Sequence, residues 1–352
     1  MNLLDLTTVS APYVMDQGEI QGAVRGMFGD AEFDLEKAER IFKSAGIDSR
    51  GFALPLERYA RGFTAAEHHT EFRRVATEML RTAAERIVPQ ELTSKITHVV
   101  TVSTSGIATP TLECAVMDEI PLSRDARRVP IFGLGCGGGV AGLQIARDLA
   151  CSRPDALVLV LCVELTSLTL FAQDMSLRNF VACAIFGDGA AGALVSGSEV
   201  PAGCEPLARL GQGSTRLFPG SHELMGWQVE DKGWRVVFSP RIPGVVEREV
   251  KGIIEGVTNR SELKHFGLHP GGRKVLEAYE NALDLNEHEM APARNALRKN
   301  GNMSAASVFF TLDEIFTAPD FTPGPGVATA FGPGFTSEAL SIDFLKSKGS
   351  RS

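Results

Sequence analysis

Apolar and polar positions alternate in blocks along most of the chain. Residues 65–87 repeat apolar side chains at helical spacing, which predicts an amphipathic helix. Residues 156–163 form an almost unbroken apolar run between turn residues, as expected for a central strand covered on both faces. Further strands are predicted at 96–102, 129–132 and 339–344, and further helices at 34–45, 111–120, 245–257, 273–283 and 305–316. This alternation indicates an α/β protein.

The same order of elements occurs twice. In the first part, an apolar stretch ending at Phe132, read as the end of a buried strand, leads through a glycine-rich turn into a helix. In the second part, an apolar strand ends at His269, and Pro-Gly-Gly leads into the next helix. Each part closes on a glycine turn that enters a strand. We therefore predict two similar α/β halves, residues 1–200 and residues 201–352.

Composition narrows the possible functions. The net charge is −8 and no basic stripe offsets it, which argues against nucleic acid as a partner. No apolar run is long enough to span a membrane, and the N-terminus lacks the basic start of a secretory signal, so we expect a cytoplasmic protein. The six cysteines contain no CxxC pair, and this spacing argues against a disulfide framework and against a zinc site.

One cysteine has unusual neighbours. Cys136 lies among six glycines in GLGCGGGVAGL, between a predicted strand and a predicted helix. Glycines permit a sharp turn and the close approach of a ligand. A thiol at the N-terminus of a helix is expected to have a lowered pKa, so the sequence favours a nucleophile. The alternative is a buried cysteine beside a glycine packing contact.

Two residues of the second half could assist that nucleophile. His269 occupies the same kind of position as Cys136, at the end of a strand and the mouth of a helix. In a pseudo-twofold fold, equivalent positions meet near the axis, so the two side chains can converge. Asn302 follows Gly301 and precedes a small-residue helix start. It is either a helix N-cap or an amide donor aimed into a cleft.

Four blocks of sequence carry a family resemblance. The segments GLGCGGGVAGL, FGLHPGGRKVLE, GNMSAASVFFTLDE and AFGPGFTSEAL resemble the signature blocks of the type III polyketide synthases, the chalcone and stilbene synthase superfamily. The resemblance runs in order from about residue 10 to the C-terminus. MGWQVEDKGWRVVFSPRIPG is more similar to the bacterial branch that makes alkylpyrones and alkylresorcinols than to the plant enzymes.

The resemblance implies a thiolase-like fold, layered αβαβα, that works as a homodimer. It places the nucleophile on Cys136, the catalytic histidine on His269 and the asparagine on Asn302. It also implies an acyl-CoA starter and malonyl-CoA as substrates, with no metal and no other cofactor. In this chemistry malonyl-CoA loses CO₂, and the resulting enolate extends the acyl group held on the cysteine.

The resemblance also places substrate-binding positions. The family's gatekeeper phenylalanine falls on Phe186, and a second gatekeeper position carries Val236 instead of phenylalanine, which would widen the passage. The positions that line the elongation cavity are Thr104, Thr166, Thr169 and Ser304. Lys37 and Arg40 match the Lys-x-x-Arg spacing that holds the CoA phosphates, although a solvated helix face explains the same spacing.

Two rival functions remain at this stage. A β-ketoacyl-acyl carrier protein synthase III has the same cysteine, histidine and asparagine but condenses only once. Arg273 and Lys274, after the His269 turn, could contribute to a basic surface for its carrier protein, or could simply be a solvated helix start. A non-catalytic paralogue is the other rival, and the intact set of three residues argues against it.

Overall fold

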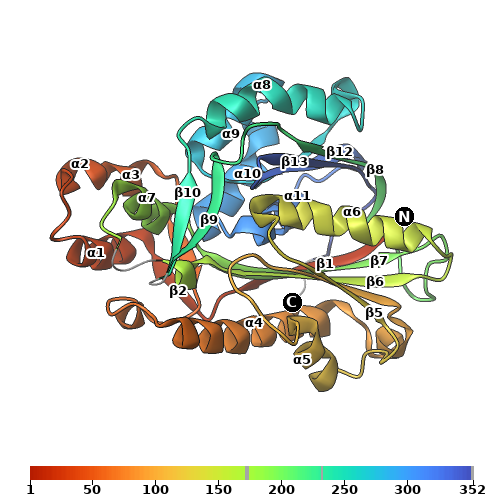
Figure 1. Ribbon diagram of the computed structural model, residues 1–352. Helices are drawn as coiled ribbons and strands as arrows, with labels where there is room; N and C mark the ends of the chain where they lie inside the picture. The colour runs from red at the N-terminus through yellow and green to blue at the C-terminus, as the bar shows by residue number, and fades with distance from the viewer. Residues whose placement is uncertain (171–173, 231–232, 350–352) are drawn as a thin grey trace.

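The computed structural model describes residues 1–170, 174–230 and 233–349 (Figure 1). The strands are β1 (Asn2–Ser10), β2 (Tyr13–Asp16), β3 (Ser49–Phe52), β4 (His98–Val102), β5 (Arg127–Ile131), β6 (Leu157–Leu165), β7 (Asp188–Ser196), β8 (Ala208–Leu217), β9 (Met225–Glu230), β10 (Gly233–Phe238), β11 (His265–Leu268), β12 (Gly324–Gly332) and β13 (Thr336–Phe344). The α-helices are α1 (Gln17–Met27), α2 (Leu35–Ala38), α3 (Arg40–Ser44), α4 (Ala65–Ile87), α5 (Leu112–Glu119), α6 (Gly138–Cys151), α7 (Leu177–Ile185), α8 (Ile242–Glu255), α9 (Arg273–Leu283), α10 (Glu287–Asn300) and α11 (Ser307–Phe316). Short 3-10 helices include η2 (Gln90–Lys95), η3 (Gly135–Gly137), η4 (Thr166–Thr169) and η6 (Ser304–Ala306).

The main sheet is shared by the two halves of the chain. Within the described residues, nine strands run in the order β11-β12-β13-β8-β1-β7-β6-β4-β5. The first half supplies β1, β7, β6, β4 and β5, and the second half supplies the other four. The halves join where β1 pairs with β8 over two residue pairs, Asn2 with Arg209 and Leu3 with Ala208.

The two halves repeat one strand pattern. In the first half, β4 is parallel to β6, β6 is antiparallel to β7, and β7 is antiparallel to β1. In the second half, β11 is parallel to β12, β12 is antiparallel to β13, and β13 is antiparallel to β8. Each half therefore has the same arrangement of parallel and antiparallel strand pairs, while the division of the chain at residue 200 stays a prediction.

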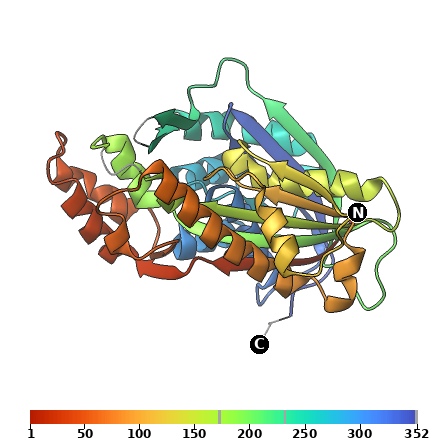
Figure 2. The same ribbon diagram turned by 60° about the horizontal axis from the view of Figure 1, so that its bottom comes forward.

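Two helices form a middle layer between the halves. Helix α6 contacts β4 and β6 from the first half and β12 and β13 from the second, and α11 contacts β1 and β11. Outside them, α4 covers β6 and β7, while α8 lies against β12 and β13 (Figures 1 and 2). Counting the first-half and second-half strands of the sheet as separate layers, the order is helix, strands, helix, strands, helix, as the resemblance implied.

The composition of α6 suits a helix buried on most sides. Its first six residues, Gly138 to Leu143, are all buried, and four of them are glycine or alanine. A Cβ added at Gly139 would lie 2.2 Å from the carbonyl oxygen of Ala305 and 2.7 Å from Val308. Glycine at this position therefore allows α6 to approach η6 and the start of α11 closely.

Most of the predicted elements are confirmed, with one error of environment. Helix α4 spans the predicted residues and begins at a capping box between Thr64 and Glu67, and β6 is buried along its whole length. Strand β5, however, is an edge strand whose residues are exposed or half-buried, so the expectation of a buried strand here was wrong. The predicted helix at 34–45 is two short helices, α2 and α3.

No helix in the described part of the chain is long and apolar enough to cross a membrane.

Candidate active site

The turn that carries Cys136 has a backbone that requires glycine. Gly135 has a φ of 46°, in the left-handed region, and a Cβ there would lie 2.7 Å from the ring of Pro333. Cys136 follows in η3, directly before α6, and is 8% exposed. The glycine-rich stretch therefore places the thiol at the start of the middle helix, against the loop between β12 and β13.

Three of the predicted residues meet at one small cavity. Cys136 from the first half lines it together with His269 and Asn302 from the second half. Its volume is about 20 Å³, and the rest of its wall is mostly apolar: Met225, Phe238, Ile242, Val246, Gly271, Val275, Tyr279 and Phe331. A nucleophile, an imidazole and an amide thus share a buried, water-poor site.

The backbone of His269 is hydrogen-bonded, whereas its imidazole lines the cavity without a hydrogen-bond partner among the described residues. Its N–H donates to the carbonyl oxygen of Thr329 at 2.9 Å, which fixes the end of β11 on β12. Both ring nitrogens are buried, and neither has a hydrogen-bond partner among the described residues. Burial lowers the pKa of His269 to about 3, so the ring is neutral. Unpaired buried nitrogens are costly, which points to a ligand that pairs with them.

Both polar atoms of the Asn302 amide are held by backbone groups. Its Oδ1 accepts a hydrogen bond from the N–H of Ser304 at 2.9 Å, and Met303, not Asn302, is the N-cap residue of η6. Its Nδ2 donates to the carbonyl oxygen of Gly271 at 3.2 Å, beside His269. The second amide hydrogen remains for the cavity. Ser304 adopts a φ of 47°, a conformation that costs free energy and is concentrated at functional sites.

The acidity of Cys136 differs from the sequence-based prediction. Burial raises the pKa of the thiol to about 12, and hydrogen bonds from Ser304 and Asn302 only partly oppose that rise. The helix-terminus argument for a lowered pKa neglected the cost of moving a thiolate out of water. Burial likewise lowers the pKa of His269, so burial favours the neutral forms of both the thiol and the imidazole.

Phe186 is tied to the same site by its backbone. It forms an isolated parallel β-bridge with Asn302, in which the N–H of Asn302 donates to Ile185 at 2.8 Å. The N–H of Gly187 donates back to the carbonyl of Asn302 at 3.0 Å. The Phe186 ring is buried and lies 6.1 Å from the ring of Trp227, centroid to centroid.

A fully buried arginine supports this bridge. Arg50 donates to the carbonyl oxygens of Phe186 and of Cys183, the latter at 2.8 Å, and to Oε1 of Gln17 at 3.0 Å. It thereby satisfies carbonyls at the end of α7, where a helix has no internal donors left. Burial lowers the pKa of Arg50 to about 10, which leaves the guanidinium charged at neutral pH.

The predicted cavity-lining threonines are all buried. The Oγ1 of Thr104 accepts the N–H of Gly135 at 3.0 Å, so Thr104 directly supports the Cys136 turn. Thr166 donates to the carbonyl of Gly187 at 2.6 Å, and Thr169 donates to the carbonyl of Thr166 at 2.7 Å. Their hydroxyls are thus engaged with the backbone around Phe186 and Cys136.

Val236 and the two basic residues have different environments. Val236 lies buried in β10, within the same hydrophobic cluster as Phe186. Lys37 and Arg40 lie on the exposed surface of α2 and α3, and Lys37 forms an ion pair with Asp34 at 2.9 Å. The structure does not bring these two side chains to the cavity, so a CoA-binding role for them stays a prediction.

Sequence reasoning missed two buried polar groups at the site. Tyr279 of α9 lines the cavity, and its hydroxyl is buried without a hydrogen-bond partner among the described residues. Glu164, at the end of β6, accepts the backbone N–H groups of Thr104 and Ser105 at 3.1 and 2.9 Å. Burial raises the pKa of Glu164 to about 7. The sequence indicates Glu164 by placing a single acidic residue in the apolar run of β6. It indicates Tyr279 by placing it four residues after Val275, on the same face of the predicted helix.

Comparison with known proteins agrees with this geometry. Residues 63–199 match the family described as chalcone and stilbene synthases, N-terminal domain, and residues 209–346 match the C-terminal domain of the same family. A 1,3,6,8-tetrahydroxynaphthalene synthase from Streptomyces peucetius is 34% identical, over 94% of this chain and 90% of the relative. Type III polyketide synthase A from Arabidopsis thaliana is 29% identical, over 95% of this chain and 90% of the relative.

Solved structures show the same fold. The 1,3,6,8-tetrahydroxynaphthalene synthase of Streptomyces coelicolor superposes with a TM-score of 0.91 at 24% identity, covering 99% of this chain and 100% of that one. The C-terminal type III polyketide synthase domain of a Dictyostelium hybrid enzyme gives a TM-score of 0.89 at 24% identity, covering 98% and 99% of the two chains. The matches to both halves show that this chain is an acyltransferase of the chalcone and stilbene synthase family, the type III polyketide synthases.

Proposed function

We propose that this enzyme loads an acyl group from acyl-CoA onto Cys136 and extends it repeatedly with malonyl-CoA. The observation that carries the proposal is the convergence of Cys136, His269 and Asn302 from two halves of the chain on one buried cavity. The reaction requires no metal and no cofactor beyond its CoA substrates.

In the first step, the neutral imidazole of His269 accepts the proton of the Cys136 thiol as the sulfur attacks the acyl-CoA carbonyl. The new thioester bond forms on Sγ, the bond to CoA sulfur breaks, and the proton passes from His269 to the leaving thiolate. The raised pKa of the thiol and the lowered pKa of the imidazole mean that separated charges form only during the reaction.

In the second step, malonyl-CoA places its thioester oxygen between His269 and Asn302. Loss of CO₂ leaves an enolate, and its oxygen is stabilised by donors from these two side chains. The imidazole must carry its proton on the nitrogen that faces this oxygen. The buried ring of Phe186 disfavours a solvated carboxylate next to it, which assists the loss of CO₂.

In the third step, the enolate carbon attacks the carbonyl carbon of the Cys136 thioester, the carbon–carbon bond forms and the bond to Sγ breaks. The chain, now two carbons longer, leaves as a β-ketoacyl-CoA, and it returns to the freed Cys136 thiol for the next round as in the first step. After a few rounds the product closes to a pyrone or a resorcinol-type ring. Valine at 236, where the plant enzymes carry phenylalanine, leaves more room beside Phe186, which supports a long aliphatic starter. The relative from Streptomyces peucetius is named for a naphthalene product, and this chain's own product is the point that needs measurement.

The rival function is a single condensation of the β-ketoacyl-acyl carrier protein synthase III type. The family match over both halves does not favour it. Arg273, one of the two candidate contacts for a carrier protein, is half exposed and pairs with Glu277 one helical turn away at 2.8 Å. A solvated helix start therefore accounts for this side chain.

We also propose that the protein is a homodimer through the edge of the sheet at β5. Ile107 and Phe132 next to this edge are 55% and 58% exposed, which is unusual for large apolar side chains. A pocket of about 120 Å³ beside them is lined by Thr101, Ser103 and Glu113. Each of these three has a buried oxygen that lacks a partner in the described part of the chain. A second copy would cover the apolar side chains and the unpaired edge.

The test of the proposed function is product mass spectrometry. Purified enzyme is incubated with malonyl-CoA and starters from acetyl-CoA to stearoyl-CoA, with Cys136→Ala as the control. Triketide or tetraketide pyrones or resorcinols that disappear in the control are the expected result. A single-condensation β-ketoacyl product, or activity only with malonyl on a carrier protein, would overturn the proposal in favour of the rival function.

A further inference from the structure

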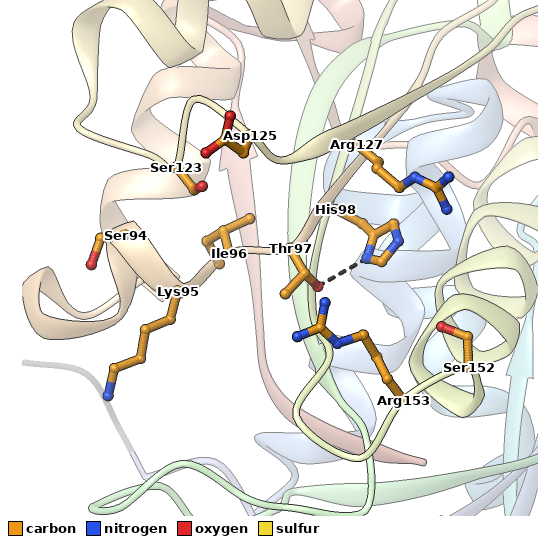
Figure 3. Close-up of a pocket in the computed structure, with 10 residues that line it drawn as sticks. All are labelled: Ser94, Lys95, Ile96, Thr97, His98, Ser123, Asp125, Arg127, Ser152 and Arg153. Carbon is orange, nitrogen blue, oxygen red and sulfur yellow. Dashed lines mark hydrogen bonds between the residues drawn. The ribbon is translucent and has the colours of Figure 1, made fainter.

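A second pocket lies far from Cys136, at the amino ends of three parallel strands. It has a volume of about 450 Å³ and is shown in Figure 3. Its wall comes from η2, from the loop before β5, from the first residues of β4 and β5, and from the turn between α6 and β6. The lining residues are Ser94, Lys95, Ile96, Thr97, His98, Ser123, Asp125, Arg127, Ser152 and Arg153.

This pocket is separate from the active site. Thr104, Cys136 and Thr166 follow the carboxyl ends of β4, β5 and β6, whereas the pocket lies at the opposite ends of the same strands. A five-residue strand such as β4 is roughly 16 Å long. A ligand of ordinary size in this pocket therefore does not reach the Cys136 thiol.

The charge of the pocket is positive in a protein that is negative overall. Lys95, Arg127 and Arg153 line it, against the single carboxylate of Asp125, while the whole chain has a net charge of −8. In the described part of the chain, no carboxylate forms an ion pair with Arg127. Arg153 pairs with Asp155 through Nε and Nη2, at 2.6 and 2.5 Å, which leaves Nη1 for another partner.

The imidazole of His98 lies in the positive electrostatic field of two arginines of the pocket. Its ring is 5% exposed, and its Nδ1 lies 2.9 Å from the hydroxyl of Thr97, so only Nε2 remains for a ligand. Figure 3 shows the ring between Arg127 and Arg153. Burial lowers the pKa of His98, and the positive charges of these two arginines lower it further. Both guanidinium groups therefore act on the same small volume.

We propose that this pocket binds a phosphate dianion, either free or as the monoester of a small metabolite. Guanidinium groups match phosphate oxygens in geometry and charge, and Arg127 and Arg153 present two of them around His98. Ser94, Ser123 and Lys95 also line the pocket, and Lys95 adds to its positive charge. A concave site with an excess of positive charge concentrates such anions from solution.

The size of the pocket distinguishes two sources of this phosphate. A free phosphate ion fills only part of about 450 Å³, and the remaining space admits a group as large as a nucleoside. The probes are therefore inorganic phosphate and AMP. Tighter binding of AMP would place the ligand among nucleoside monophosphates, and equal affinity would mean that the phosphate alone is recognised.

The experiment is isothermal titration calorimetry of the full-length protein with each probe, with chloride adjusted to constant ionic strength. Arg127→Gln and Arg153→Gln are each expected to weaken phosphate binding about tenfold or more, the usual effect of losing a charged hydrogen bond. The matched control is Arg248→Gln, at an exposed arginine paired with Glu249 on α8, which should change affinity less than twofold.

A second readout tests the geometry directly. Bound phosphate stabilises the imidazolium of His98, so NMR titration should show its pKa rising when phosphate is added to the wild-type protein and rising less in Arg127→Gln. Binding that chloride reproduces, or that is unchanged in both arginine variants, would overturn the proposal. So would a pKa of His98 that does not respond to phosphate.

Discussion

Phe186 of the first half and Asn302 of the second half are joined by a parallel β-bridge, in which the backbone of each segment donates to the other. The bridge sets the predicted gatekeeper ring and the predicted amide donor in one fixed relation. Because Asn302 Oδ1 is also held by Ser304, the side chain has little freedom to turn away from the cavity.

Removing that amide should separate the two chemical steps. In Asn302→Ala, we expect decarboxylation of malonyl-CoA to fall about 100-fold or more, the usual effect of losing one oxyanion donor. Loading of the starter should persist, because Cys136 and His269 remain. Release of labelled CO₂ and the mass of the acylated protein measure the two steps. Pyrone formation at the wild-type rate would contradict the assignment of Asn302.

The buried Arg50 should contribute to stability far more than an exposed arginine. Arg50→Met leaves the carbonyl oxygens of Phe186 and Cys183 buried without a donor, so we expect the free energy of unfolding to fall by about 3 kcal/mol. Arg248→Met, at an arginine whose side chain is 64% exposed, should change it by less than about 0.5 kcal/mol. Urea denaturation of both variants is the measurement, and similar losses would refute the positioning role.

The close packing of α6 can be tested by comparing an alanine substitution at a crowded glycine of α6 with one at an uncrowded glycine of α8. Gly139→Ala drives a methyl group into the carbonyl of Ala305, 2.2 Å away, and should lower the free energy of unfolding by about 2 kcal/mol. Gly252→Ala in α8 meets nothing within 4 Å and should raise it by about 1 kcal/mol, because alanine favours the helix. Thermal unfolding of both variants would show opposite shifts, and equal shifts would contradict the close contact.

The carboxyl of Glu164 predicts a pH dependence of stability. Burial raises its pKa from 4.5 to about 7, so the folded state binds this proton more tightly than the unfolded state. Its contribution to stability is therefore present below pH 4.5 and is lost as pH rises towards 7. Glu164→Gln removes this dependence, so the loss of unfolding free energy between pH 5 and pH 8 should shrink by about 3 kcal/mol.

The control for this titration is Glu36→Gln, at an exposed position on α2. Denaturant titrations of the three proteins at several pH values measure the effect. Asp188 and Glu338 also have raised pKa values, of about 6 and about 7, so the wild type and both variants share their contribution. Parallel pH profiles for the wild type and Glu164→Gln would show that Glu164 ionises as readily folded as unfolded.

The proposed dimer predicts a change of mass on one substitution. Phe132→Asp places a charge on the apolar surface beside β5 and should convert the dimer to monomers at micromolar concentration, as measured by light scattering after gel filtration. Val14→Asp is the matched control, because Val14 is 61% exposed on β2, which pairs with β3 in a separate two-stranded sheet. A wild-type monomer, or a dimer that survives Phe132→Asp, would refute this interface.

The sequence was most informative where one local rule decides the structure. Helical spacing predicts α4 to the residue, and the apolar run of β6 predicts a buried strand. An apolar run cannot distinguish a buried strand from an edge that a second copy covers, so the environment of β5 was missed. The dipole argument for Cys136 failed for a similar reason, because desolvation depends on tertiary packing that no local pattern encodes.

The middle layer has a consequence for how the molecule holds together. Helices α6 and α11 each contact strands of both halves. The inner face of each half's strands is therefore covered by helices that the other half also contacts. A cut between β7 and β8 would leave two fragments with bare apolar faces, which must find one another before either is stable. The two halves thus repeat the same order of helices and strands, but we expect them to fold together as one cooperative unit.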